Sequence, residues 1–257
     1  MDLALITGAS KGIGKAIAEE LAARKYNLLL VARSGEMLQQ VANEFREKYK
    51  IEVDILAIDL SLADSPEKVF NWCKEKNHSI NILVNNAGYG LSGLFDKYSI
   101  AENINMVQLN IIALVKLCQL FLPQLKQQSK SYILNIASSA AYQAVPYLSL
   151  YSASKSFVLS FSRGLRQELK KTSVSVTCIS PGSTDTDFAV RAQIGEKGLK
   201  TASKVNMTPK DVAKIAVNSM FAGKTEVVVG LLNKLGAFMA WLMPKGLVET
   251  TAMKIYE

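Results

Sequence analysis

Short apolar runs alternate with amphipathic segments along most of this 257-residue chain. The runs are apolar at nearly every position, whereas a strand with one face in water would carry a polar residue at every second position. Strands of that kind belong to a parallel sheet covered by helices on both faces. The sequence therefore predicts a doubly wound α/β fold. The expected strands are residues 3–7, 27–32, 52–58, 80–84, 132–137, 174–179 and 226–229, and the expected helices are residues 12–24, 35–50, 65–77, 102–127, 151–170 and 209–221.

Length and cysteine usage fit a single domain spanning residues 1–257. A chain of this length buries about 70 to 75% of the surface that its unfolded form exposes, and α/β folds of this size are commonly one domain. The first strand begins at Asp2 or Leu3, which leaves no room for a signal or transit peptide. Cys73, Cys118 and Cys178 are widely spaced and odd in number, so we expect neither a disulfide framework nor a metal site. We expect a reducing compartment, the cytoplasm.

Histidine content and charge exclude other classes of protein. His78 is the only histidine, which argues against a Ser-His hydrolase and against histidine-rich metal sites. The net charge of +8 would suit a nucleic-acid-binding protein if the basic residues were clustered. They are instead scattered along amphipathic helices, so we interpret most of them as solvated and expect no nucleic-acid partner.

The first expected strand runs directly into a glycine-rich turn, TGASKGIG, which opens the first expected helix. Strand, glycine turn and helix form the context that a dinucleotide-binding fingerprint requires. Gly8, Gly12 and Gly14 would let the backbone turn tightly and approach a pyrophosphate at the amino end of the helix. Three glycines near a helix start are also compatible with ordinary turn chemistry.

Tyr151 and Lys155 lie four residues apart on an expected helix, with Ser138 thirteen residues upstream of Tyr151. Residues four apart project from the same helix face, so the ammonium can lie beside the phenol. A nearby positive charge lowers the phenol pKa from its ordinary value of about 10. Such a tyrosine can exchange a proton with an alcohol or alkoxide. A surface contact is the alternative for the pair alone.

Together these motifs resemble the short-chain dehydrogenase/reductase family. The glycine turn is similar to the family's Thr-Gly-x3-Gly-x-Gly motif, residues 85–88 to its Asn-Asn-Ala-Gly motif, and Tyr151, Lys155 and Ser138 to its active site. The motifs follow in the family's order across residues 1 to 190. The carboxy-terminal stretch departs from the family's glycine-rich pattern, which leaves the substrate pocket and the oligomer open.

The resemblance implies a Rossmann-type seven-stranded sheet of order 3-2-1-4-5-6-7, with a dinucleotide at the carboxyl ends of the strands. It also implies catalytic roles. Tyr151 would transfer a proton, Ser138 would bind the substrate oxygen, and Lys155 would bind the nicotinamide ribose. Asn110 would hold a water that relays the proton, although such an asparagine can also face solvent or bond a neighbouring strand. Ser139 is a less well spaced substitute for Ser138.

Residues of the expected cofactor site come from six segments of the chain. Asp59 would contact the adenine ring or cap the following helix, and Thr186 would orient the carboxamide, with Thr184 as a substitute. The full set is Gly8, Ser10, Lys11, Gly12, Ile13, Gly14, Arg33, Asp59, Leu60, Asn86, Ala87, Gly88, Tyr151, Lys155, Pro181, Gly182, Thr184 and Thr186.

The end of the second expected strand indicates which dinucleotide binds. An acidic residue there would bind the 2′-hydroxyl of NAD, whereas an arginine accommodates the 2′-phosphate of NADP. This strand ends at Arg33, and Lys11 offers a second positive charge. Glu36 is nearby, but a carboxylate also suits the first turn of a helix. The sequence therefore favours NADP(H).

The function that these residues predict is interconversion of a carbonyl and a secondary alcohol by hydride transfer. The resemblance places the substrate among Tyr142, Val145, Tyr147, Phe188 and Leu91, with residues 182–208 as the substrate loop. That apolar pocket would suit a ketone, a 3-oxoacyl group or an aldehyde. A lipid-metabolising reductase at a membrane surface and a non-catalytic nucleotide-sensing protein are the alternatives.

Residues 230–257 predict an apolar helical extension. Lys234 interrupts the run, so no transmembrane span is expected, and Pro244 ends the helix. We expect the stripe to cover the substrate cleft or form a contact in a homodimer or homotetramer, with peripheral membrane contact left open. The stripe consists of Leu231, Leu232, Leu235, Phe238, Met239 and Leu242.

Overall fold

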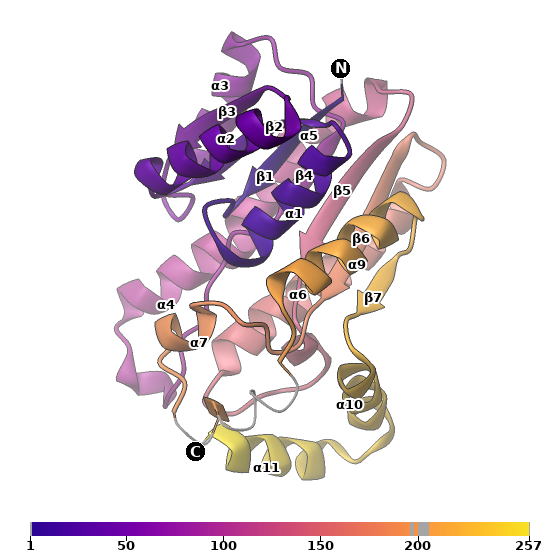
Figure 1. The fold of residues 1–257 in the computed structure, drawn as a ribbon. Helices are drawn as coiled ribbons and strands as arrows, with labels where there is room; N and C mark the ends of the chain where they lie inside the picture. The colour runs from indigo at the N-terminus through magenta and orange to yellow at the C-terminus, as the bar shows by residue number, and fades with distance from the viewer. Residues whose placement is uncertain (1, 196–197, 200–205, 257) are drawn as a thin grey trace.

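A single parallel sheet of seven strands forms the centre of the molecule (Figure 1). The computed structural model describes residues 2–195, 198–199 and 206–256. The strand order is β3-β2-β1-β4-β5-β6-β7, and every neighbouring pair is parallel, so the predicted fold class is confirmed. The strands are β1 (Leu3–Thr7), β2 (Asn27–Ala32), β3 (Val53–Ala57), β4 (Ile82–Asn85), β5 (Ser131–Ile136), β6 (Val174–Ser180) and β7 (Glu226–Val228).

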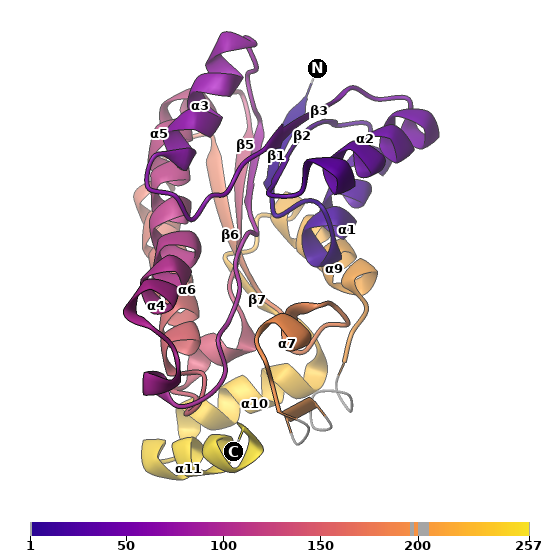
Figure 2. The same cartoon turned by 90° about the vertical axis from the view of Figure 1, so that its left-hand side faces the viewer.

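Helices cover both faces of the sheet, as the apolar runs require. One face carries α1 (Gly12–Ala23), α2 (Gly35–Tyr49) and α9 (Pro209–Phe221), and the other carries α3 (Ser65–Glu75), α5 (Ala113–Gln127) and α6 (Ser149–Glu168) (Figure 2). Each face has its own buried apolar cluster, and β1, β2, β4, β5 and β6 are almost entirely buried between them. The carboxyl ends of the central strands therefore meet at one well-supported edge.

The helix expected over residues 102–127 starts two residues earlier, at Ile100, because Ser99 and Glu102 form a capping box. It continues through α4 (Ile100–Val107), a π-helical turn (Gln108–Ile112) and α5. Among the described residues this is the one helix that is long and apolar enough to cross a membrane by length and composition alone. Phe121 and neighbouring side chains on α5 are buried in the core cluster of the sheet, so this helix is part of the core.

In the part of the chain that the structure describes, three short helices were not predicted from the sequence, because three or four residues are too few to show a helical period. They are η1 (Phe95–Lys97), η3 (Ser139–Tyr142) and α7 (Phe188–Arg191). The last belongs to the predicted substrate loop 182–208, part of which lies outside the described residues. Both η3 and α7 follow the carboxyl ends of strands, where the sheet presents its loops (Figure 1).

The predicted C-terminal extension forms two helices, α10 (Leu231–Leu242) and α11 (Lys245–Tyr256), separated by Pro244. Among the described residues, α10 meets the rest of the protein along one side, where Asn233 lies against Gly182 and Ala240 is buried. The prediction that the apolar stripe packs on the cleft of its own chain is wrong, because its large side chains are 40 to 82% exposed. The exposed residues are Leu231, Leu232, Leu235, Phe238, Met239 and Leu242. A subunit contact for the stripe stays a prediction.

Candidate active site

A cavity of about 440 Å³ opens at the carboxyl edge of the sheet and brings together most of the predicted site residues. Gly14 and Asn110 are the two that do not line it; they lie directly behind its walls. The predicted residues that line the cavity are Gly8, Ser10, Lys11, Gly12, Ile13, Arg33, Asp59, Leu60, Asn86, Ala87, Gly88, Ser138, Tyr151, Lys155, Pro181, Gly182, Thr184 and Thr186.

The glycine turn leaves the start of α1 open to the cavity. Gly12 has a φ of +59°, which an L side chain rarely adopts, and a Cβ on Gly14 would lie 2.2 Å from the carbonyl oxygen of Gly8. Only glycine allows this close fold of the turn. The first N–H groups of a helix have no partner within the helix and attract anions. The cradle therefore fits the pyrophosphate of a dinucleotide.

Thr7 and Asn86 hold the glycine turn against the loop after β4. The Thr7 hydroxyl accepts the N–H groups of Asn86 (3.0 Å) and Ala87 (3.1 Å) and donates to the carbonyl of Val84 (3.1 Å). The Asn86 side chain donates to the carbonyls of Thr7 (3.0 Å) and Gly8 (3.2 Å). These bonds fix two walls of the cavity relative to each other. The sequence prediction missed this role of Thr7, although its place at the end of β1 marked it as adjacent to the turn.

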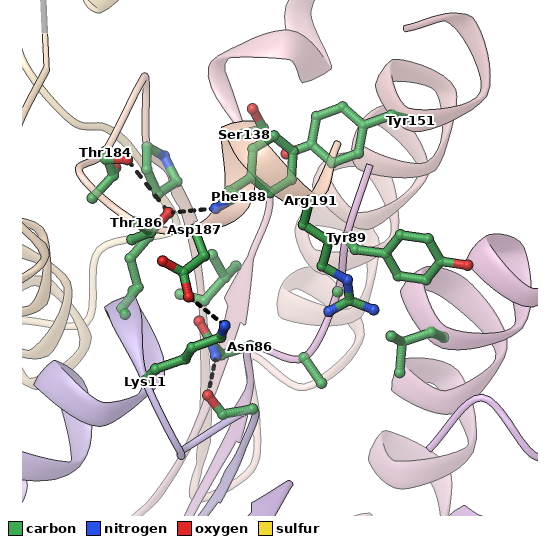
Figure 3. Close-up of a pocket in the computed structure, with 18 of the residues that line it drawn as sticks. Lys11, Asn86, Tyr89, Ser138, Tyr151, Thr184, Thr186, Asp187, Phe188 and Arg191 are labelled. Atoms are coloured by element: carbon green, nitrogen blue, oxygen red, sulfur yellow. Dashed lines mark hydrogen bonds and ion pairs between the residues drawn. The ribbon is translucent and has the colours of Figure 1, made fainter. Parts of the chain in front are cut away.

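Tyr151 and Lys155 lie in the first turns of α6 and both line the cavity. Ser138 follows β5 and lies near Tyr151 (Figure 3). The Lys155 ammonium lies 5.9 Å from the centre of the Tyr151 ring and donates to the carbonyl of Ile136 at 2.9 Å. Burial lowers the pKa of Lys155 to about 8. The Ser138 hydroxyl accepts the N–H of Ala140 at 3.1 Å, and within the described chain no acceptor takes its hydrogen. This hydroxyl is therefore free to donate to a ligand oxygen.

Asn110 lies in the π-helical turn and braces the wall behind Gly88. Its side-chain oxygen accepts the N–H of Tyr89 (3.1 Å), and its amide nitrogen donates to the carbonyl of Tyr89 (2.9 Å) and to the Ser154 hydroxyl (3.0 Å). Ser154 in turn donates to the carbonyl of Tyr151 at 2.7 Å. The amide of Asn110 thus joins the loop after β4 to helix α6. Its predicted role in holding a water stays a prediction.

The loop after β6 crosses the cavity and contacts both of its sides. Asp187 forms an ion pair with Lys11 of the glycine turn, 176 residues away in the sequence (Figure 3). The Phe188 ring packs on the Tyr151 ring with centroids 5.1 Å apart. A Cβ on Gly90 would lie 2.9 Å from the Phe188 ring, so only glycine leaves room for this ring. Sequence analysis missed Asp187, because nothing local links it to Lys11.

Charged groups line the far end of the cavity, beyond the ends of β2 and β3. Asp59 accepts the N–H and the hydroxyl of Ser61 at 2.9 and 2.8 Å. Burial alone would raise the pKa of Asp59, but the bonds from Ser61 and the charges of Arg33 and Arg191 hold it below its ordinary value. Arg191 reaches in from α7, with its guanidinium 4.4 Å from the centre of the Tyr89 ring. Neither Arg191 nor Tyr89 was among the predicted site residues.

Most of the side chains predicted to line the substrate pocket lie elsewhere. Phe188 lines the cavity as expected, but Val145 is in the core, and Leu91 and Tyr147 line a separate small pocket. Tyr142 donates to Glu226 at 2.5 Å. None of these four side chains lines the cavity, which contradicts their predicted place in the substrate pocket. Residues that line it instead include Ser139, Ala140, Leu109, Leu148 and Ile194.

The described residues contain no group of three or more His, Cys, Asp and Glu side chains suited to a metal ion. Cys73, Cys118 and Cys178 are free and buried, and burial raises the pKa of each thiol to about 12. These thiols are therefore poor nucleophiles, and the chemistry of the cavity depends on its hydroxyl, ammonium and guanidinium groups.

Comparison with known proteins agrees with this geometry. The sequence model of the family described as short chain dehydrogenase matches residues 2–197. An uncharacterized oxidoreductase of Staphylococcus saprophyticus is 34% identical over 218 residues, covering 85% of this chain and 90% of that protein. A very-long-chain 3-oxoacyl-CoA reductase of Anas platyrhynchos is 36% identical over 260 residues, covering 98% of this chain and 78% of that protein.

A solved structure is similar over nearly the whole chain. A short-chain dehydrogenase from Sphingobium yanoikuyae in complex with NADPH has a TM-score of 0.81 and 30% identity, covering 96% of this chain and 95% of that one. The family model and these relatives confirm the resemblance that the motifs predicted. This chain belongs to the short-chain dehydrogenase/reductase family and is an oxidoreductase.

Proposed function

We propose that this short-chain dehydrogenase interconverts a carbonyl and a secondary alcohol on an apolar substrate, with NADP(H) as the cofactor. The observation that carries the proposal is the presence of Tyr151, Lys155 and Ser138 in one cavity with the glycine turn. When bound, the nicotinamide would supply or accept the hydride at the carbonyl carbon.

The side chains of the cavity would do the acid and base chemistry. In the reducing direction Tyr151 would donate a proton to the carbonyl oxygen, and in the oxidising direction it would accept the proton of the alcohol. The Ser138 hydroxyl would donate a hydrogen bond to that oxygen and fix its position. A protonated Lys155 would favour the phenolate form of Tyr151 by its charge.

Two features of the cavity support NADP(H) over NAD(H). Arg33 follows directly after β2, where an acidic residue would be expected for NAD(H). Lys11 also lines the cavity, where the phosphate of NADP(H) would compete with Asp187 for its ammonium group. The similar Sphingobium yanoikuyae enzyme is described with NADPH, which agrees with this choice.

For the substrate we propose a ketone, a 3-oxoacyl group or an aldehyde with an apolar body. Phe188, Leu109, Leu148 and Ile194 line the cavity, and Phe188 packs directly on Tyr151. Apolar walls of this kind favour apolar ligands. Several similar proteins are named as 3-oxoacyl-CoA reductases, so a 3-oxoacyl thioester is the first compound to try.

The proposal is tested by following NADPH and NADH oxidation with a panel of 3-oxoacyl thioesters, bulky ketones and apolar aldehydes. We expect turnover of at least one class with NADPH and a marked preference over NADH. Turnover with NADH alone would refute the cofactor assignment. Binding of NADPH without turnover of any carbonyl or alcohol would favour a nucleotide-sensing protein instead.

One observation favours the alternative of a reductase acting at a membrane surface. The exposed stripe of α10 includes Phe238, and Trp241 beside it is 73% exposed with ring centroids 6.0 Å apart. Aromatic and aliphatic side chains of this kind suit the boundary between lipid headgroups and acyl chains. Sedimentation with lipid vesicles distinguishes this candidate from a subunit interface.

A further inference from the structure

Two arginines of the cavity lie outside every ion pair found among the described residues. Arg33 and Arg191 both line it, and neither takes part in any ion pair found within the described part of the chain. Lys11, in contrast, is paired with Asp187. Two guanidinium groups that face one open cavity without an ion-pair partner are suited to binding an anion.

Arg191 is held in place by a defined set of contacts. Its guanidinium lies over the Tyr89 ring, and the Tyr89 hydroxyl donates to the Asn105 side chain at 2.8 Å. Asn105 donates to the Ser61 hydroxyl at 2.9 Å, and Ser61 donates to Asp59 at 2.8 Å. A chain of bonds therefore links the ring beneath Arg191 to the carboxylate at the end of β3. The guanidinium is oriented before any ligand binds, which reduces the entropy lost on binding.

The charges around Arg191 favour binding of an anion. Burial and then the charge of Arg33 lower the pKa of Arg191, while Tyr89 and Asp59 act in the opposite direction. The two arginines are therefore near enough to repel each other, and the single carboxylate of Asp59 only partly offsets this. A phosphate, with one to two negative charges, would remove the repulsion and accept hydrogen bonds from both guanidinium groups.

The position of Arg191 indicates which phosphate group of a dinucleotide it would bind. The pyrophosphate would lie at the open start of α1, beside Gly12 and Ile13. Arg191 instead interacts with Arg33 and Asp59, which follow β2 and β3, where the adenosine half would lie. We infer that Arg191 is a second arginine that, together with Arg33, binds the 2′-phosphate of NADP(H) and selects it over NAD(H). This inference rests on the proposed function.

Binding to the cofactor-free protein tests the inference without measuring turnover. Arg191→Met keeps an unbranched apolar side chain over Tyr89 but removes the charge, and Arg191→Lys keeps a charge. The ligands are NADPH, NADH, adenosine 2′,5′-bisphosphate and 5′-AMP, measured by calorimetry. The matched control is Arg24→Met, which removes an arginine that lies over the Phe221 ring outside the cavity.

We expect Arg191→Met to lower the affinity for NADPH and for adenosine 2′,5′-bisphosphate by about tenfold or more, because a hydrogen bond between charged groups is lost. NADH and 5′-AMP should change by less than about twofold to threefold, as should every ligand in Arg24→Met. Arg191→Lys should recover part of the loss. The loss in Arg33→Met/Arg191→Met should differ from the product of the single losses, because both side chains contact one phosphate.

Other outcomes separate this inference from the proposed function. Equal weakening of NADPH and NADH would place Arg191 at the pyrophosphate or in a purely structural role, and would overturn it. Unchanged NADPH affinity with a raised KM for an acyl thioester would assign Arg191 to a substrate phosphate, which also overturns it. If the unmodified protein binds NADH better than NADPH, the proposed cofactor itself is wrong. If Arg33→Met loses affinity for NADPH and Arg191→Met does not, the proposed cofactor stands and only the role inferred for Arg191 is wrong.

Discussion

Phe188 lies on the ring of Tyr151, with ring centroids 5.1 Å apart and an interplanar angle of 48°. The Tyr151 phenol, the proposed proton donor, is therefore covered by a side chain of the loop after β6 rather than by a fixed element of the sheet. Since Phe188 also lines the cavity, it forms a wall that an apolar substrate would contact next to the reacting oxygen.

Replacing Phe188 by Ala should raise KM for an apolar carbonyl more than it lowers kcat. The lost contact between the ring and an apolar substrate corresponds to about 1 to 3 kcal/mol, or roughly a tenfold to hundredfold loss of kcat/KM. Phe188→Leu should recover part of it. Phe157→Ala removes a half-exposed ring on the same chain and is the control. Steady-state kinetics with NADPH at saturation gives the result, and an unchanged KM would place the substrate elsewhere.

Tyr151→Phe removes the ionisable hydroxyl and keeps the ring that packs on Phe188. We expect kcat to fall by about 10² to 10⁴, because the group that exchanges the proton is lost. The affinity for NADPH should stay within about threefold. Tyr132→Phe, a buried tyrosine on β5, is the matched control. Retention of turnover by Tyr151→Phe would show that another group transfers the proton.

Lys155 makes the stability of the protein depend on pH in a specific direction. Its pKa is about 8 in the folded cofactor-free protein, against an ordinary value of 10.5. Between these two values the unfolded chain binds more protons than the folded chain, so the free energy of unfolding rises with pH across this window. Below about pH 8 both states are protonated, and the cost of burying the charge is constant.

Lys155→Met removes this contribution. The difference in unfolding free energy between variant and unmodified protein should favour the variant most below pH 8 and shrink by an amount on the order of 3 kcal/mol by about pH 10.5. Loss of the hydrogen bond to Ile136 changes this difference in unfolding free energy by the same amount at every pH, so it does not alter the dependence on pH. Urea denaturation at several pH values measures it. A difference independent of pH would contradict the lowered pKa of Lys155.

The strand Leu3–Thr7 could be predicted from the sequence, whereas the ion pair of Asp187 could not. The bounds of β1 and β2 match the expected ranges because both strands are buried on both faces and end at polar or glycine residues. Tyr151 and Lys155 could be paired because their spacing is local. The ion pair of Asp187 with Lys11 depends on how the loop crosses the cavity, and no local pattern encodes such a contact.

The position of Arg191 in the cavity also could not be predicted from the sequence. In the sequence it is one of 30 Lys and Arg residues, scattered as solvated residues usually are. It becomes a candidate cofactor-binding residue only because the short helix α7 places its guanidinium over the Tyr89 ring. The reverse error concerns Tyr142, Val145, Tyr147 and Leu91, which the resemblance placed in the pocket but which do not line the cavity.

The exposed stripe of α10 leads to the last prediction, which concerns assembly. Leu235 and Phe238 are 56 and 54% exposed, and burying each such side chain contributes about 1.5 to 3 kcal/mol. We expect the protein to form a homodimer or homotetramer through this stripe. Leu235→Glu/Phe238→Glu would place two carboxylates in the contact and should shift the protein to a smaller species in light scattering. Leu62→Glu, at an exposed leucine away from α10, should leave the mass unchanged.

Vesicle sedimentation decides between assembly and membrane attachment. If the stripe is a subunit contact, the unmodified oligomer should stay in the supernatant with vesicles of phosphatidylcholine and phosphatidylglycerol, because its apolar side chains are already covered. A monomer that sediments with these vesicles, and that Leu235→Glu/Phe238→Glu releases, would contradict the subunit contact. That result would instead support a reductase that collects apolar substrates at a lipid surface, since burial of the same side chains would then take place in the membrane.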